Sequence, residues 1–236
     1  MSGAAPTRRE RRRSETTTEI KETALRLMAA GGPGAITLRA IAREMGMTPN
    51  AVYSYFATRD DLVTALIRDV YDDLARAVIT ARDDRPGEDA AGRIMAWACA
   101  FREWSLANTE GFRLIYGDPV PGYRPPEGAA PEAAHRVCAG LTGLAAGAWP
   151  HAASAYADNG FEWSDFDAHL VELVRAEFPD LPPAAVAIAL RIWGHLHGLV
   201  SLEILGHLRA QTTNPDKLYR TEITHLIRAL GLTPPG

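Results

Sequence analysis

A short segment in the N-terminal quarter of the chain combines hydrogen-bonding, aromatic and small side chains in a pattern suited to contacting the edges of DNA bases. Residues 48–56 read TPNAVYSYF, and Val52 and Phe56 are four residues apart, so both can face inward from one helix. The side chains left for packing or for solvent are Thr48, Asn50, Ala51, Tyr53, Ser54 and Tyr55. Because a helix of two turns is unstable alone, it must be held by its neighbours. Its small, polar first turn suits entry into a major groove.

The preceding residues predict a second short helix that holds this segment in place. Its apolar face is formed at i, i+3, i+4 and i+7 by Leu38, Ile41, Ala42 and Met45. Thr37 can supply the hydroxyl cap of this helix, and Gly46 suits the left-handed position that ends it. Thr48 can cap the next helix, with Pro49 at its first position. The spacing therefore predicts a helix-turn-helix.

Residues 36–67, ITLRAIAREMGMTPNAVYSYFATRDDLVTALI, resemble the DNA-binding domain of the TetR family of bacterial regulators. The resemblance spans roughly Thr16 to Tyr71 and depends on Gly46, Tyr53, Phe56 and Arg59, where the family more often has Lys at the last position. Together with the helix geometry it implies groove contacts from Thr48, Asn50, Ala51, Tyr53 and Ser54. It implies phosphate contacts from Thr37, Arg39, Tyr55 and Arg59.

Charged residues are distributed unevenly along the chain. The net charge of the 236 residues is −4, but residues 1–60 hold ten basic and six acidic side chains, whereas the remainder holds fifteen basic and twenty-three acidic ones. The helix-turn-helix therefore lies in a segment of net charge +4 and is followed by one of −8. Neutralisation of phosphates supplies most sequence-independent affinity for DNA, so this division is expected of a DNA-binding protein.

One further helix and a basic arm are predicted before the helix-turn-helix. From Thr16, a helical stripe of Ile20, Thr23, Ala24, Leu27 and Met28 runs to the Gly-Gly-Pro-Gly sequence at 31–34. The arginines of the arm are Arg8, Arg9, Arg11, Arg12 and Arg13. The arm is either a solvated flexible tail or an extension that reaches DNA phosphates or a minor groove. The predicted domains are thus a flexible basic arm over 1–15, a DNA-binding domain over 16–71 and a helical effector-binding and dimerisation domain over 72–236.

A long helix from Thr58 to about Arg82 is expected to link the two domains. Thr58 can cap it, and Asp60 and Asp61 lie in the first turn, where the helix dipole favours carboxylates. Beyond residue 87 helices are predicted over about 88–108, 110–117, 130–148, 164–178, 182–209 and 214–230, separated by Pro- and Gly-rich segments at 118–126 and 179–183. No segment alternates with period two. The predicted fold is therefore all-α, a three-helix helix-turn-helix domain joined by a long helix to a helical bundle.

The C-terminal part contains a Trp-x-x-x-His-Gly sequence formed by Trp193, His197 and Gly198. With the DPVPGYRPPE sequence at 118–127, it resembles one subgroup of TetR-family C-terminal domains. In that family the last two long helices pair with their mates as a four-helix dimer interface. The resemblance implies a homodimer whose interface includes Gly194, Gly198, Leu202, Leu205, Ile223, Leu226 and Ile227. The alternative role of Trp193 and His197 is to anchor packing within one chain.

Aromatic residues suggest a ligand pocket in the same bundle. Trp97, Phe101 and Trp104 follow i, i+4 and i+7 on one helix face. Because helix bundles commonly hold ligands between helices, we expect a pocket for a mostly apolar small molecule. The residues expected to line it are Trp97, Phe101, Trp104, Tyr116, His135, Cys138 and Trp193. The alternative is that this stripe is ordinary core packing.

Other kinds of site find little support in the sequence. Cys99 and Cys138 are isolated, so both are interpreted as buried apolar groups, with a redox pair as the alternative. His195 and His197 point about 200° apart on a helix, and Glu203 with His207 suits a charged helix face, so no metal or cofactor is expected. Neither a catalytic arrangement nor a phosphate-binding loop is recognisable. Without an apolar run of about 18 residues or an N-terminal signal, the chain is expected in the cytoplasm and away from membranes.

The sequence therefore predicts a homodimeric, one-component transcription regulator, a repressor by family resemblance. Its partners would be double-stranded operator DNA, a second copy of the chain and a small-molecule effector. One alternative is a helical ligand-binding or protein-interaction module that does not bind DNA. A further alternative is a small enzyme on a helical scaffold, which would need a cleft at Trp193 and His197.

Overall fold

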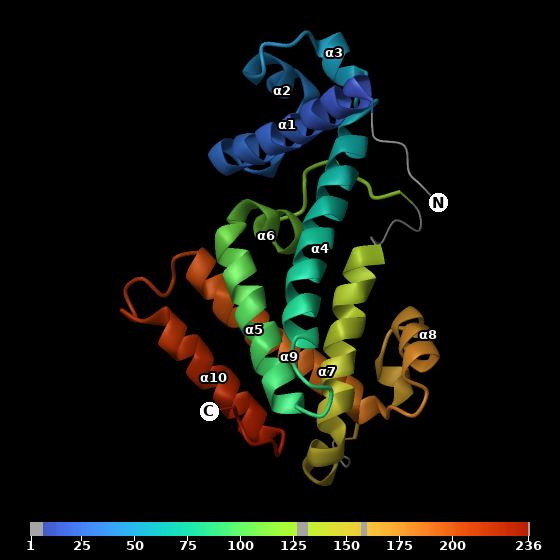
Figure 1. Cartoon of the computed structure of the whole chain (residues 1–236), viewed down its shortest axis with the longest axis vertical. Helices are drawn as coiled ribbons and strands as arrows, with labels where there is room; N and C mark the ends of the chain where they lie inside the picture. The colour runs from blue at the N-terminus through green and yellow to red at the C-terminus, as the bar shows by residue number, and fades with distance from the viewer. Residues whose placement is uncertain (1–6, 127–131, 157–159, 236) are drawn as a thin grey trace. The chain divides into compact units, whose positions relative to one another are not determined.

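The structure is a computed structural model that describes residues 7–126, 132–156 and 160–235. Every regular element in these ranges is helical, as predicted (Figure 1). The chain divides into two compact units. The N-terminal unit comprises Met1–Val70 and Asn108–Pro131, and the C-terminal unit comprises Tyr71–Ala107 and Glu132–Gly236. The long helix α4 (Arg59–Asp83) contributes residues to both units.

The N-terminal unit contains the predicted helix-turn-helix. It is built from α1 (Arg8–Gly31), the 3-10 turn η1 (Pro33–Ala35), α2 (Leu38–Glu44), α3 (Pro49–Tyr53), the start of α4 and α6 (Thr109–Tyr116). The caps form as predicted, since the Thr37 and Thr48 hydroxyls accept bonds from backbone amides within α2 and α3. Gly46 adopts φ +65°, the left-handed conformation that glycine permits. The fully buried side chains that hold the helices together are Ile20, Ile36, Ile41, Val52 and Leu62.

Helix α1 begins earlier than the sequence pattern predicts, at Arg8 instead of Thr16. Thr7 and Glu10 form a capping box, in which the Thr7 hydroxyl accepts from the Glu10 amide and the Glu10 carboxylate accepts from the Thr7 amide. Residues 8–15 are all exposed, and their sequence has none of the apolar periodicity from which the start of the helix was predicted. The predicted flexible arm over 1–15 is therefore wrong for residues 8–15, and residues 1–6 lie outside the described ranges.

The segment after α5 (Ala90–Ala107) belongs to the N-terminal unit, although the predicted boundary at residue 71 assigns it to the second domain. The Arg59 Nη1 donates to the Pro121 carbonyl at 2.9 Å, and the hydroxyls of Thr64 and Tyr123 are 3.0 Å apart. Gly111 of α6 lies against Val70, where an added Cβ would be 3.3 Å from a methyl group. These contacts explain why a segment distant in sequence packs with the first helices.

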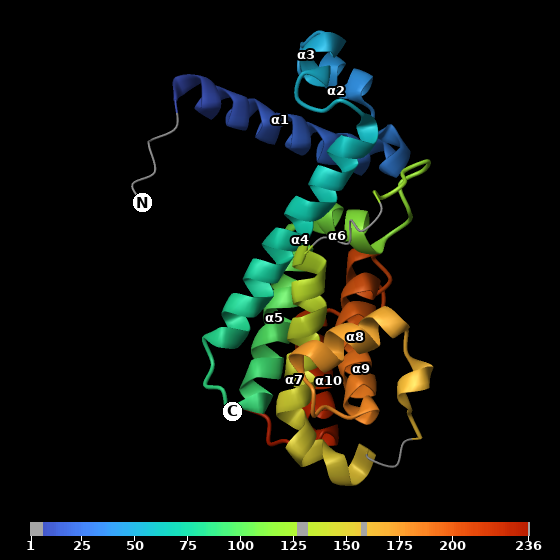
Figure 2. The same ribbon diagram turned by 90° about the vertical axis from the view of Figure 1, so that its right-hand side faces the viewer.

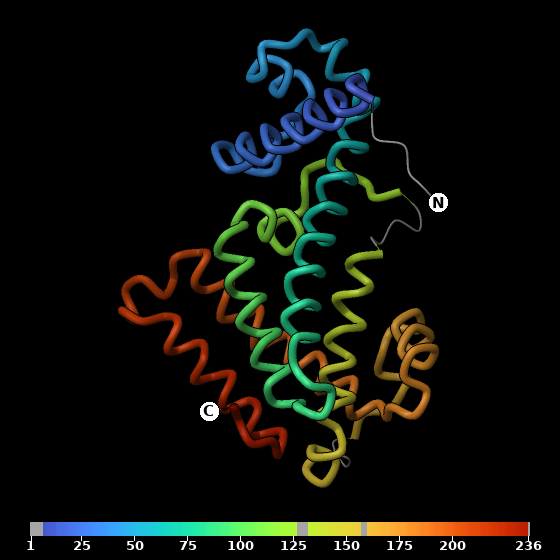
Figure 3. Tube along the Cα trace, in the orientation of Figure 1, coloured from blue at the N-terminus to red at the C-terminus, as the bar shows by residue number. Residues whose placement is uncertain are grey.

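The C-terminal unit is a helical bundle around α7 and α9. It contains the end of α4, α5 (Ala90–Ala107), α7 (Glu132–Tyr156), the 3-10 turn η2 (Trp163–Asp165), α8 (Ala168–Glu177), α9 (Pro183–Ile204) and α10 (Pro215–Ala229). Helices α7 and α9 share the most extensive contact, and α5 packs against α7, α9 and α10 (Figures 2 and 3). Helix α7 continues through Pro150 beyond its predicted end at 148, and its predicted start at 130 lies outside the described residues. Helix α9 ends at Ile204 instead of 209.

Helix α9 is the one helix in the described ranges that is long and apolar enough to cross a membrane by length and composition. The most apolar part of it is 39% buried within the chain. One such helix is weak evidence for a membrane span, because a core helix has the same properties. Since α9 packs against α5, α7 and α10, it is a partly buried core helix of the C-terminal unit.

Candidate functional site

The exposed face of the helix-turn-helix carries the side chains that the sequence assigned to DNA. Thr37 and Arg39 are exposed at the start of α2, and Thr48, Asn50 and Ser54 are exposed along α3. Tyr53 is 44% exposed, an unusual state for a large aromatic side chain, while Ala51 and Tyr55 are half-buried. Val52 and Phe56 are buried as predicted, so they turn the polar face outward. The structure thus places eight of the nine predicted residues on or beside one surface.

The arginine-rich start of α1 joins this surface. The Arg13 Nη2 donates to the Ser54 carbonyl at 2.8 Å, and the guanidinium carbon lies 4.8 Å from the centre of the Tyr55 ring. Such stacking of a cation on an aromatic face is favourable. The contact fixes the first turns of α1 next to the C-terminal end of α3. The exposed arginines on these turns are Arg8, Arg9, Arg11, Arg12 and Arg13.

Arg59 has a role that the sequence analysis did not foresee. Its Nε donates to the Ile36 carbonyl at 2.6 Å, its Nη1 to Pro121 at 2.9 Å and its Nη2 to Pro33 at 3.4 Å. Three of its five N–H donors therefore bind backbone carbonyls of its own unit. Arg59 ties η1 and the segment after α6 to the first turn of α4. The structure gives Arg59 a structural role in the N-terminal unit, and its contact with a DNA phosphate stays a prediction.

The predicted aromatic pocket is not assembled in the structure. Trp97, Phe101 and Trp104 are 1%, 3% and 7% exposed and fill the core, where the Trp104 indole donates to Asp73 at 2.8 Å. Tyr116 belongs to the N-terminal unit and packs on Phe112. The other three predicted pocket residues do not join this stripe. Trp193 is 40% exposed, and His135 and Cys138 border a separate space of only about 20 Å³. The i, i+4, i+7 pattern therefore marked core packing.

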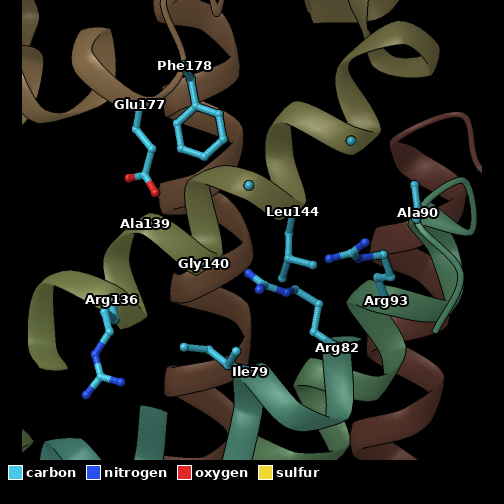
Figure 4. Close-up of a pocket in the computed structure, with 13 residues that line it drawn as sticks. Ile79, Arg82, Ala90, Arg93, Arg136, Ala139, Gly140, Leu144, Glu177 and Phe178 are labelled. Carbon is cyan, nitrogen blue, oxygen red and sulfur yellow. The ribbon is translucent and has the colours of Figure 1, made fainter. Parts of the chain in front are cut away.

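A larger cleft lies elsewhere in the C-terminal unit. Its volume is about 460 Å³, and α4, α5, α7 and the end of α8 line it (Figure 4). The principal lining side chains are Ile79, Arg82, Arg93, Arg136, Leu144, Glu177 and Phe178, together with the glycines Gly140, Gly143 and Gly147. The sequence analysis missed this cleft. The signal that could have found it was the i, i+3, i+7 spacing of the glycines, which leaves one face of α7 without side chains.

Arginines and carboxylates form ion pairs at this cleft. Asp83 accepts from Arg82 Nε at 2.7 Å and from Arg82 Nη2 and Arg93 Nη2 at 3.1 Å. Hydrogen bonding from Arg82 holds the pKa of Asp83 below its usual value, so this carboxylate is charged at neutral pH. Arg136 pairs separately with Asp72 at 2.6 Å. Two guanidinium groups therefore share one carboxylate at one end of the cleft.

Helix α9 exposes an apolar face to solvent. Leu190, Gly194, Gly198 and Leu202 follow each other at intervals of four residues, and all are exposed. An added Cβ at either glycine would meet nothing within 4 Å. Trp193 and Leu205 are also exposed, at 40% and 60%, and a groove of about 630 Å³ lies between this face and α10. A face of this kind suits close approach of another helix.

Three of the predicted interface residues do not belong to that face. Ile223, Leu226 and Ile227 on α10 are 0%, 2% and 0% exposed because they pack into the core of their own unit. The prediction that they contact a second chain is corrected. The predicted interface residues that remain accessible are Gly194, Gly198, Leu202 and Leu205.

The two cysteines are not paired with each other, and the described residues contain no group of three metal-binding side chains. Cys99 is half-buried, accepts from Arg220 Nη1 at 3.2 Å, and burial raises the pKa of its thiol. Cys138 is exposed, although the sequence favoured a buried position, and partial desolvation raises the pKa of its thiol as well. Neither thiol has the lowered pKa of a reactive nucleophile.

Comparison with known proteins matches both parts of the chain. The family model described as bacterial regulatory proteins, tetR family, matches residues 20–66, and the model described as Tetracyclin repressor-like, C-terminal domain, matches residues 94–226. The HTH-type transcriptional regulator Rv1816 of Mycobacterium tuberculosis is 34% identical over 92% of this chain and 93% of its own. The crystal structure of the regulatory protein SCO4313 is 35% identical, with a TM-score of 0.72 over 94% of this chain and all of that one. A tetR-family regulatory protein from Rhodococcus RHA1, 21% identical with a TM-score of 0.61 over 93% of this chain and 98% of its own, shares the fold.

Proposed function

Because the chain belongs to the TetR family of DNA-binding transcription regulators, which are not enzymes, we propose that it is a homodimeric repressor released from its operator by a small molecule. The observation that carries this proposal is the exposed polar face of α3, held outward by buried Val52 and Phe56. As a soluble regulator of this family it would act in the cytoplasm. The Trp193, His197 and Gly198 sequence supports the further proposal that it belongs to a subgroup of the family with similar C-terminal domains.

The residues proposed to contact base edges are Thr48, Asn50, Ala51, Tyr53 and Ser54. The first turn of a recognition helix meets the base edges, and this turn contains Asn50, whose amide can both donate to and accept from a base. Thr37, Arg39 and Tyr55 are proposed to contact phosphates next to the groove. Of these, Tyr55 is half-buried under Arg13, so its hydroxyl would be the contacting group.

The exposed arginines of α1 extend the proposed DNA surface. Arg13 is attached to the end of α3 through Ser54 and Tyr55, so a DNA segment in contact with α3 would meet the first turns of α1. Five arginines in six positions supply positive charge for phosphates or for a minor groove. A helical start fixes these side chains better than a flexible arm would, which reduces the entropy lost on binding.

Dimerisation is proposed through the exposed face of α9. Leu190, Leu202 and Leu205 would be covered by the same face of a second chain, and Gly194 and Gly198 would let the two backbones approach closely. Covering this face would also explain why a helix as apolar as α9 leaves several large side chains in solvent. A two-fold dimer would present two α3 helices to two half-sites.

The effector is proposed to bind in the 460 Å³ cleft of the C-terminal unit rather than in the aromatic stripe. Ile79 and Arg82, on the cleft wall, belong to α4, the helix that begins at Arg59 in the N-terminal unit. A ligand that favours one position of α4 would therefore favour one arrangement of the two α3 helices. It releases DNA only if it binds the DNA-incompetent state better, because coupling is a difference of affinities.

Selection of bound fragments from random duplex DNA tests the proposal. We expect an enriched sequence with two inverted half-sites, and we expect Asn50→Ala to change the preferred base within each half-site. Arg76→Ala is a suitable control because its side chain is 70% exposed on α4, outside the proposed DNA surface. Recovery of no common sequence by the wild-type protein would favour the alternative of a module that binds ligands or proteins but not DNA.

A further inference from the structure

The cleft in the C-terminal unit contains space that its own side chains do not fill. On α7, an alanine Cβ at Gly143 would lie 3.6 Å from Phe178, and one at Gly147 would lie 3.9 Å from Ala90, both ordinary contact distances. At Gly140, by contrast, an added Cβ would lie 2.3 Å from the Trp97 ring, so there the core already occupies the space. The volume of about 460 Å³ is within the range of sites for small molecules.

The two ends of this cleft differ in how their arginines are paired. Arg136 and Gly147 are eleven residues apart on α7, which corresponds to about 16 Å along the helix. At the end near Arg136, its charge is compensated by Asp72 and by Glu177 in the wall. At the other end, Arg82 and Arg93 both donate to Asp83, so two guanidinium groups share one hydrogen-bonded carboxylate. Figure 4 shows Arg82 and Arg93 at one end of the cleft and Arg136 at the other.

The donors of Arg82 are divided between the carboxylate and the cleft. Its Nε and Nη2 bind Asp83, whereas Nη1 lies 3.5 Å from the position that a Cβ on Gly140 would take. This nitrogen therefore faces α7 beside Gly140 and the Trp97 ring, at the wall of the cleft that Arg82 lines. Arg93 reaches the same carboxylate from α5 and is 25% exposed in its side chain. Guanidinium groups that line a cleft and remain partly exposed can bind an incoming carboxylate or phosphate with charge-assisted hydrogen bonds.

The rest of the wall is mainly apolar. Leu144 and Phe178 provide the larger apolar surfaces, with Ile79 and two alanines beside them. A small inorganic anion would leave these surfaces without contact. A molecule that combined one acidic group with an apolar body would contact both parts of the wall.

On the basis of the proposed function, we propose that the effector is an organic anion with a single carboxylate or phosphate group on an apolar body. The acidic group binds between Arg82 and Arg93, and the body lies along α7 against Leu144 and Phe178. Because Arg82 is on α4, the acidic group contacts the helix that continues into the N-terminal unit.

Titration calorimetry of the full-length protein without DNA tests this inference with three eight-carbon probes. Octanoate and octyl phosphate carry the acidic group, and octanol carries the same body without charge. We expect at least one of the two acids to bind at least about tenfold more tightly than octanol, because hydrogen bonds to charged groups are the strong ones. The comparison between the acids distinguishes a carboxylate from a phosphate ligand. Equal binding of octanol and the acids, or no binding of either acid, would overturn the inference.

Two arginine variants locate the binding site. Arg93→Gln should weaken binding of the acid by about tenfold, while Arg136→Gln, at the compensated end of the same cleft, should change it by less than about threefold. An unchanged affinity in Arg93→Gln would place the acid elsewhere and overturn the inference. These measurements contain no DNA, so they are separate from the proposed function. Failure of the protein to select any operator would reject the proposed function even if the acids bind.

Discussion

Replacement of Arg59 separates a structural role of this side chain from a role in binding DNA. Its guanidinium donates two short bonds, to Ile36 at 2.6 Å and to Pro121 at 2.9 Å, and a longer one to Pro33 at 3.4 Å. A hydrogen bond from a charged group contributes about 1.5 to 3 kcal/mol to stability. Because Arg59 is partly exposed, each of the two short bonds should contribute about 1.5 kcal/mol, the lower end of this range. Arg59→Ala should therefore reduce the free energy of unfolding of the N-terminal unit by about 3 kcal/mol.

The measurements are chemical unfolding of the N-terminal unit within the full chain and the salt dependence of operator binding. Hydrogen exchange of α1 and α2 amides reports the stability of this unit separately from the rest of the chain. Arg68→Ala is a matched control, because this arginine of α4 is 63% exposed and its nearest carboxylate oxygen, on Asp69, is 4.0 Å away. It should change the free energy of unfolding by less than about 0.5 kcal/mol.

The salt dependence decides between the two roles. If Arg59 bound a phosphate, its removal would lower the slope of log affinity against log salt by about one. Since three of its five donors bind backbone carbonyls, we expect the slope of the folded Arg59→Ala protein to equal that of the wild type. A slope reduced by about one with unchanged hydrogen exchange would refute the structural role and restore the phosphate contact.

Three further predictions concern the cleft, the dimer and base recognition. Gly140→Ala should lower the free energy of unfolding by about 1 to 3 kcal/mol, because the new methyl group would overlap the Trp97 ring. Gly143→Ala should leave the free energy of unfolding equal or raise it, and urea denaturation measures both variants. Leu202→Glu should convert a dimer into a 25.6 kDa monomer in sedimentation velocity, and an unchanged dimer would remove α9 from the interface. Asn50→Ala should change the difference in binding free energy between the preferred operator and its base-substituted variants by about 1 to 3 kcal/mol per half-site in competitive binding. An equal loss of affinity for all sequences would exclude a base contact.

Sequence patterns were sufficient where short-range rules determine the structure. Thr37, Thr48 and Gly46 specify their caps and turn locally, and α4 begins within one residue of the prediction because Thr58 and Asp61 form reciprocal backbone bonds. The exposed face of α3 follows from the burial of Val52. In each case the residues that decide the structure lie within four positions of one another.

Long-range packing decided the features that the sequence did not reveal. Trp97 has the same helical spacing whether it lines a pocket or fills a core, and only the approach of Gly140 from α7 shows that it is core. Arg59 is a basic residue in the expected position, but its acceptors lie 23 to 62 residues away in sequence. The cleft likewise combines α4, α5, α7 and α8, so no local motif encodes it.

The proposed operator binding is tested most directly by titrating the selected duplex with protein at several salt concentrations. We expect two chains per duplex and an affinity that falls steeply with salt, with a slope of about −0.9 for each phosphate contacted. Several contacts from Thr37, Arg39 and the α1 arginines of each chain should be present. Binding that is absent or independent of salt would contradict the proposal that the α3 face of this protein is a DNA-binding surface.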